Sequence, residues 1–96
     1  IRAFAKAQLP KPLAVEVSPG IKLGTIVRPL DTVAAYIPSG RYPLPSTLLM
    51  TTEPAQAAGV PNICVTSPRF VEEIFGAAHL LGIRQAFQIG GAQAIA

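Results

Sequence analysis

From Thr32 onward, the chain alternates between continuous apolar runs and segments in which apolar residues recur every three or four positions. The continuous runs fall at residues 33–37, 62–66 and 86–89. Apolar runs of this length, without polar alternation, are typical of strands that are buried on both faces of a parallel sheet. The pattern therefore predicts three buried parallel strands that are joined by helices.

The first of the intervening helices is predicted over residues 46–58. Ser46 is placed to cap its amino end, and Gly59 is placed to end it. Pro54 lies inside this segment and removes one backbone hydrogen bond, so we expect a kink or a short break there.

The second helix is predicted over about residues 70–81, before a glycine at position 82. Its apolar face, which should pack on the sheet, consists of Val71, Ile74, Phe75, Ala78 and Leu81. Right-handed β-α-β crossovers of this kind produce a doubly wound sheet with helices on its faces. The predicted fold class is therefore α/β, with a Rossmann-like parallel sheet and flanking helices, incomplete at this length.

The first part of the chain follows another pattern. Residues 1–8 have apolar positions at helical spacing and predict the end of an amphipathic helix. Residues 14–29 read as two extended pieces around a Ser-Pro-Gly turn, which predicts a hairpin. We therefore expect residues 1–30 to belong or link to a neighbouring domain, and residues 31–96 to form the first half of a Rossmann-like domain.

Composition narrows the possible functions. Half of the 96 residues are hydrophobic and 14% are charged, so we expect a fragment whose surface faces further protein. The eight Lys and Arg residues are scattered along the chain, and there is no Trp, so a nucleic-acid partner is not expected. Cys64 is the only cysteine, and its apolar neighbours favour a strand-core position in a reducing cytoplasm. No run approaches the roughly 20 apolar residues of a membrane span, so no membrane partner is expected.

Each predicted strand ends in a turn with distinctive residues. Tyr36 and Pro38 follow the first strand, a Thr-Ser-Pro turn follows the second, and Gly90-Gly91 with Gln93 follows the third. Because the carboxyl ends of parallel strands lie at one edge of a sheet, we expect the Tyr36 ring, the Pro38 turn and the Gln93 amide to lie close together there. This arrangement favours binding of a flat ligand with polar edges. After the diglycine, the tail reads as the start of a helix.

Structural interpretations stay open for each of these residues. Tyr36 also fits a strand-end aromatic residue whose hydroxyl finds a backbone partner, and Pro38 fits ordinary turn punctuation. Gly90-Gly91 also fits a simple turn that leaves Gln93 exposed. Neither a G-x-G-x-x-G fingerprint nor a P-loop occurs, which excludes a conventional Rossmann phosphate grip.

Catalytic and metal-binding groups are sparse. His79 is the only histidine, and it lies off the apolar face of the second helix, so we interpret it as a surface residue. With one histidine, one cysteine and five acidic residues, no metal cluster, catalytic triad or carboxylate pair can be assembled. The sequence therefore predicts no catalytic or metal-binding residue in this chain.

Five segments together resemble histidinol dehydrogenase in their order and spacing. They are VRPL at residues 27–30, YIPSGRYP at 36–43, PSTLLM at 45–50, PAQAAGV at 54–60 and IGGAQAIA at 89–96. The resemblance covers essentially the whole chain. Its tyrosine-proline-glycine and diglycine-alanine-glutamine motifs are quite specific to that family.

The resemblance implies an NAD-dependent, zinc-requiring enzyme that oxidises L-histidinol through L-histidinaldehyde to L-histidine and works as a homodimer. Tyr36 and Gln93 match residues that contact NAD in relatives, and Pro38 lies in the same cofactor-facing turn as Tyr36. The family's catalytic residues and zinc ligands match no position of this chain, so this segment alone is expected to be inactive. Ser39 stands where relatives commonly have glycine, which adds a Cβ and a hydroxyl beside the cofactor turn.

Two alternative functions remain. A sister branch of the superfamily oxidises a sulfonated propanediol with NAD, and GRY at residues 40–42 resembles segments of that branch, whereas PSTLLM favours the histidinol branch. The other alternative is a non-catalytic fragment that binds a nucleotide weakly, or that acts as an interaction module through its exposed apolar surface.

Overall fold

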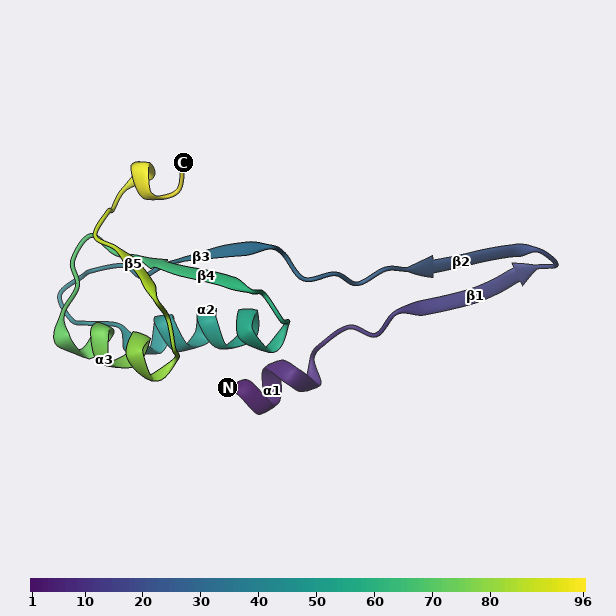
Figure 1. Cartoon of the computed structure of the whole chain (residues 1–96), viewed down its shortest axis with the longest axis horizontal. Helices are drawn as coiled ribbons and strands as arrows, with labels where there is room; N and C mark the ends of the chain where they lie inside the picture. Colours follow the sequence, from purple (N-terminus) through teal and green to yellow (C-terminus); the bar gives the residue numbers. More distant parts are fainter.

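A β-hairpin projects away from an α/β unit, which gives the molecule an elongated outline (Figure 1). The computed structural model describes residues 1–96, and its extents are 59 × 29 × 23 Å. In chain order, the elements are α1 (Arg2–Ala7), β1 (Leu13–Ser18), β2 (Ile21–Thr25), β3 (Thr32–Tyr36), α2 (Pro45–Ala57), β4 (Asn62–Thr66), α3 (Glu72–Leu80), β5 (Gln85–Phe87) and the 3₁₀ turn η1 (Ala92–Ala94). None of the helices combines the length and the apolar composition that crossing a membrane requires.

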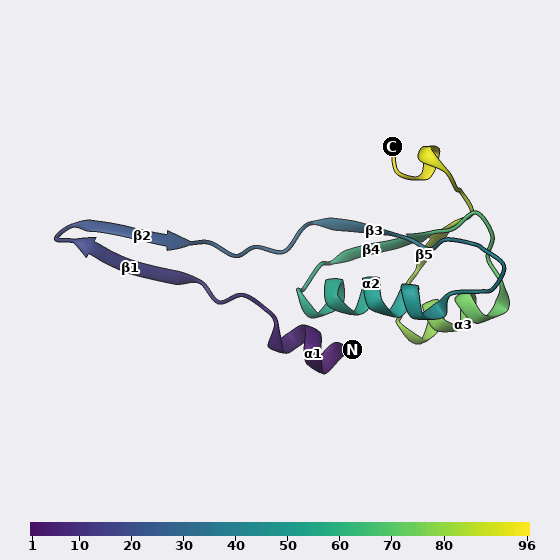
Figure 2. The same ribbon diagram turned by 180° about the vertical axis from the view of Figure 1, so that it is seen from behind.

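The α/β unit is built on a parallel sheet with the strand order β3-β4-β5. Tyr36 lies opposite Thr66, and Thr66 lies opposite Phe87, so the carboxyl ends of the three strands are level. Because both crossovers step in the same direction, α2 and α3 lie on one face of the sheet, as Figures 1 and 2 show from opposite sides. The predicted α/β fold class with a parallel sheet is confirmed.

The hydrophobic core lies between the sheet and these two helices. It consists of Ala35, Ile37, Leu48, Val65, Ile74, Ala78 and Leu81. The other face of the sheet carries no α-helix, and all of β5 is exposed. The prediction that the strands are buried on both faces is therefore wrong here, because helices cover only one face.

Helix α2 differs from its prediction at its amino end and at Pro54. Its N-cap is Leu44, with Pro45 in the first turn, and no side chain caps it, so the assignment of Ser46 as the cap is wrong. Proline is favoured in the first helical turn, because its fixed φ suits the helix and its missing N–H is not needed there. The helix also continues through Pro54 without a break, since the Ala58 N–H resumes the pattern by donating to the Pro54 carbonyl at 2.9 Å. Gly59 follows with φ +81°, as predicted for the residue that ends the helix.

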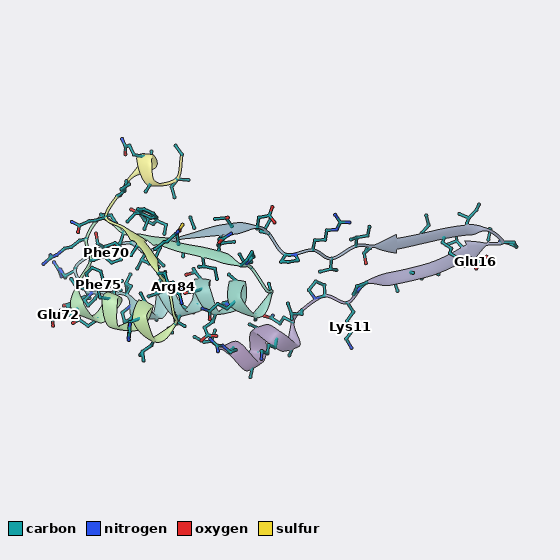
Figure 3. All side chains as sticks on the ribbon, in the orientation of Figure 1. Lys11, Glu16, Phe70, Glu72, Phe75 and Arg84 are labelled. Atoms are coloured by element: carbon teal, nitrogen blue, oxygen red, sulfur yellow. The ribbon has the colours of Figure 1, made fainter.

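Helix α3 presents most of its predicted apolar face to the core. Ile74, Ala78 and Leu81 are buried, and the helix ends before Gly82, whose φ is +70°. Phe75 is the exception, because it is 54% exposed and stacks on Phe70 with ring centroids 5.0 Å apart (Figure 3). This pair lies at the margin of the core, since Phe70 packs against the core while Phe75 is largely exposed.

The predicted hairpin is confirmed as the antiparallel pair β1–β2. Its turn uses Gly20 at φ +82°, where the Gly20 N–H donates to the Glu16 carboxylate at 2.9 Å. One face carries apolar side chains that are 46–60% exposed: Leu13, Val15, Val17, Ile21 and Leu23. The other face pairs Glu16 with Lys22. The hairpin is therefore amphipathic, but nothing in this chain covers its apolar face (Figure 3).

Helix α1 packs against α2, although the hairpin separates the two helices in the sequence. The Arg2 Nε–H donates to Glu53 Oε2 at 2.6 Å, and a second Arg2 nitrogen donates to Gln56 at 2.8 Å. Of the apolar residues at helical spacing in α1 and just before it, Ala5 is buried, whereas Ile1 and Phe4 are exposed. A partly exposed ion pair of this kind adds little stability, so it mainly orients α1 on α2.

Candidate functional site

The three turns that were predicted to share an edge do so. Each turn begins directly after the last residue of its strand, and these last residues, Tyr36, Thr66 and Phe87, lie side by side in the sheet. Two backbone bonds continue the ladder into these turns, from the Ile37 N–H to the Thr66 carbonyl at 2.8 Å and from the Ser67 N–H to the Phe87 carbonyl at 3.1 Å. The carboxyl edge of the sheet is thus the place where the candidate residues gather.

Tyr36 meets the diglycine turn at this edge. The Gly91 N–H donates to the Tyr36 hydroxyl oxygen at 3.4 Å, a long hydrogen bond at an exposed position. Tyr36 is half-buried, and its own O–H has no acceptor in the chain. The hydroxyl therefore supports the turn through its oxygen while its proton remains available to a ligand.

Both residues of the diglycine need to be glycine, for different reasons. A Cβ at Gly90 would overlap the ring of Pro68. Gly91 has φ +69° and ψ −162°, a backbone conformation that is essentially confined to glycine. Gly90 is therefore required because Pro68 lies too close for a side chain, and Gly91 is required because of its backbone conformation.

Pro38 and Gln93 are both exposed at the same edge. Gln93 lies in η1, a single 3₁₀ turn, where the tail was predicted to begin a helix. Only three backbone bonds form along this tail, too few to stabilise a longer helix. The Gln93 side chain makes no hydrogen bond, and its Oε1 lies 2.9 Å from the position that a Cβ of Gly91 would occupy. The amide is therefore free and sits beside the turn.

The buried hydroxyls of Thr66 and Ser67 hold the backbone of the turns at this edge. The sequence alone assigned them no individual role. Thr66 donates to the Ile89 carbonyl at 2.7 Å, and Ser67 donates to the Arg69 carbonyl at 2.9 Å. Because both side chains are almost fully buried, these bonds are needed to satisfy them. The sequence feature that could have predicted this role is the pair of hydroxyl residues at the end of an apolar strand. A hydroxyl at that position can hydrogen bond to the backbone of the next turn.

Two arginines that the sequence analysis treated as scattered come together near this edge. Arg41 and Arg69 line one hollow of about 150 Å³, together with Ser39, Gly40, Tyr42, Pro43 and Val71. The arginines follow different strands and lie 28 positions apart in numbering (69 minus 41). The interpretation of the basic residues as scattered is therefore wrong for this pair.

A larger hollow, of about 410 Å³, lies at the opposite edge of the sheet. It is lined by Gln56, Val60, Pro61, Asn62, Ile63, Gly82, Ile83, Arg84 and Gln85, and by none of the candidate site residues. Asn62 and Gln85 begin β4 and β5, so this hollow is at the amino ends of the strands. In parallel α/β sheets, ligands bind at the carboxyl ends, which favours the Tyr36 edge as the functional one.

His79 is exposed on α3, as the sequence indicated. No group of three or more His, Cys, Asp or Glu side chains lies close enough together to hold a metal ion. The carboxyl edge thus offers a free hydroxyl, a free amide and a diglycine turn without side chains. It offers no ligand set for zinc.

Comparisons with known proteins agree on one family. The family model of histidinol dehydrogenase matches residues 1–96. A histidinol dehydrogenase of Photobacterium profundum is 47% identical over 97 residues, which cover all of this chain and 22% of that protein. One of Methanothermobacter thermautotrophicus is 43% identical over 101 residues, covering all of this chain and 24% of that protein.

The structural comparison gives the same result. The crystal structure of histidinol dehydrogenase from Elizabethkingia anophelis matches with a TM-score of 0.88 and 35% sequence identity, covering 99% of this chain and 23% of that one. The chain therefore spans about a fifth to a quarter of the length of these relatives.

Proposed function

The chain belongs to the histidinol dehydrogenase family, and we propose that it forms the NAD-facing edge of an enzyme that oxidises L-histidinol through L-histidinaldehyde to L-histidine. One observation carries the proposal: the Gly91 N–H bonds to the Tyr36 hydroxyl. This contact unites two motifs that are 55 residues apart at the edge where ligands of parallel sheets bind.

Tyr36, Pro38 and Gln93 are the proposed NAD contacts. The Tyr36 O–H and the Gln93 amide have no acceptor or donor partner in the chain, so both can hydrogen bond to a ligand. Pro38 fixes the backbone direction directly after β3, which keeps that turn in place. When bound, NAD accepts a hydride in each oxidation step, and these residues hold and orient it.

The resemblance also implies zinc, but residues 1–96 do not fit a zinc site, since no His, Cys, Asp and Glu cluster is present. We therefore derive no step through zinc. In this proposal, the metal ligands and the acid–base residues belong to parts of the enzyme outside these 96 residues.

The proposed assembly is a homodimer in the cytoplasm. The apolar face of the β1–β2 hairpin supports contact with further protein, because five exposed aliphatic side chains share it. The free thiol of Cys64 is consistent with a reducing compartment. The division into residues 1–30 and 31–96 stays a prediction, and the packing of α1 on α2 ties the start of the first segment to the second.

An activity assay tests the proposed function. In the full protein that the gene encodes, L-histidinol should drive NAD reduction, and the variant Gln93→Ala should raise the KM for NAD by about tenfold, as expected for one lost hydrogen bond of about 1.4 kcal/mol. Gln85→Ala, an exposed glutamine at the opposite end of β5, is the matched control and should leave KM unchanged.

Two other outcomes of this assay would reject the proposal. Reduction of NAD with the sulfonated propanediol, but not with histidinol, would assign the chain to the sister branch. No reduction with either substrate would favour the non-catalytic alternative.

A further inference from the structure

The hollow between the β3–α2 and β4–α3 loops is the feature that the proposed contacts leave unexplained. Ser39 to Pro43 form one wall, and Arg69 with Val71 form the other. Ser39 is three residues beyond Tyr36, and three residues of extended chain span at most about 11 Å. The hollow therefore lies within the reach of a ligand that also contacts Tyr36.

The hollow has a positive charge that nothing in the chain neutralises. The guanidinium groups of Arg41 and Arg69 make no ion pair and no hydrogen bond, and the one ion pair in the chain is Arg2–Glu53. None of the seven lining residues is acidic. Glu72 and Glu73, in the first turn of α3, are the nearest acids in sequence, and they are exposed outside the hollow.

The amino ends of two helices add to this positive potential. Val71, which lines the hollow, is the N-cap residue of α3, and Pro43 precedes Leu44, the N-cap residue of α2. Neither helix has a side-chain cap. In α2, however, Pro45 has no N–H and the Thr47 N–H donates to the Leu44 carbonyl at 3.1 Å, so the first turn of α3 is the better source of free N–H groups. A helix N-terminus carries about half a positive charge, which Glu72 and Glu73 partly offset at α3.

Paired arginines beside a serine hydroxyl are suited to a phosphate group. The planar guanidinium can donate two parallel hydrogen bonds to phosphate oxygens, and Ser39 can donate another. The volume of about 150 Å³ is several times the roughly 10–15 Å³ that one ordered water requires, so the hollow can admit a phosphate group. The absence of the usual Rossmann glycine fingerprint leaves the phosphate grip to other groups.

We propose that Arg41, Arg69 and Ser39 form a phosphate-binding subsite that holds the diphosphate of the dinucleotide. The proposal rests on NAD being the ligand of the Tyr36 edge. It assigns a role to Ser39, where relatives commonly have glycine, and it separates phosphate recognition from the diglycine turn.

The test compares ligands with and without phosphate in the full protein. Isothermal titration calorimetry with NAD, ADP, adenosine and inorganic phosphate is carried out on the wild type and on the double variant Arg41→Gln/Arg69→Gln. Arg84→Gln is the control, because Arg84 is an exposed arginine before β5, away from this edge (Figure 3). Thermal unfolding verifies that all variants fold.

We expect the double variant to weaken NAD and ADP binding by about tenfold or more, as expected for lost charged hydrogen bonds, and to leave adenosine binding unchanged. Wild-type affinity for NAD should also fall more steeply with salt than that of the double variant. Arg84→Gln should match the wild type within about twofold.

The remaining outcomes separate this subsite from the proposed function. If NAD binds equally well to the wild type and to the double variant, or if Arg84→Gln weakens binding as much, the subsite is wrong while the NAD site stands. If ADP depends on the two arginines but NAD does not bind, the dinucleotide assignment and the proposed function both fail. If inorganic phosphate binds as tightly as ADP, the subsite is one for free phosphate, and the dinucleotide assignment is overturned.

Discussion

Leu48→Ala is expected to lower the free energy of unfolding of the α/β unit by about 2–5 kcal/mol, the cost of truncating a fully buried leucine. Leu48 is 0% exposed and belongs to the core between α2 and the sheet. The core around it includes Ile37, Val65 and Ile74, so truncation leaves a cavity in the packed centre of this unit. Since domains are stable by about 5–15 kcal/mol, this one change removes a large share.

Hydrogen exchange at the Val65 amide in the full protein measures this effect, because Val65 lies in the central strand and its side chain is fully buried in the same core. The matched control is Leu80→Ala, since Leu80 is also a helical leucine but is 87% exposed. The control should change stability by less than about 0.5 kcal/mol. Equal losses in the two variants would contradict the assigned core.

Gly91→Ala is expected to destabilise the diglycine turn by about 1–3 kcal/mol, because φ +69° with ψ −162° is unfavourable for a residue with a Cβ. The added Cβ would also lie 2.9 Å from Gln93 Oε1. The Gln93 side chain can turn away from the Cβ, but relief of the backbone strain moves the Gly91 N–H away from the Tyr36 hydroxyl. We therefore expect the Kd for NAD to rise about tenfold or more, since each 1.4 kcal/mol is a factor of ten.

Gly76→Ala is the control for this change. Gly76 lies inside α3 with open space around its Cβ position, so alanine should stabilise that helix by about 0.5–1 kcal/mol and leave NAD affinity unchanged. Calorimetric titration of NAD into the two full-length variants makes the comparison. An unchanged Kd in Gly91→Ala would show that the turn does not shape the ligand site.

Much of the fold could be predicted from local patterns. Gly20, Gly59 and Gly82 mark the turn and the helix ends that the structure shows, because each takes a positive φ that glycine tolerates best. Cap assignment failed at Ser46, since Pro45 competes for the first helical turn. The exposure of β5 could not be predicted from its own sequence, because the burial of a strand depends on the elements that pack on it, and residues 1–96 supply α-helices for one face only.

The candidate site was predictable to the extent that strand ends determine it. Tyr36 and the diglycine meet because parallel strands end at one edge, which holds regardless of loop detail. The pairing of Arg41 with Arg69 depends instead on the paths of two loops, and no periodic pattern records these paths. The Thr66 bond to the Ile89 carbonyl joins residues 23 positions apart and depends on the tertiary fold, whereas the Ser67 bond to the Arg69 carbonyl is local and fits a short hydroxyl turn.

The central claim is that the carboxyl edge of this sheet is an NAD surface. Hydrogen–deuterium exchange of the full protein with and without NAD tests it most directly, because bound ligand slows exchange where it covers and orders the backbone. We predict slower exchange in residues 36–41 and 88–95, with no change in the hairpin at residues 13–25. Unchanged exchange in both edge segments at saturating NAD, or protection confined to the opposite edge at residues 82–85, would contradict the account.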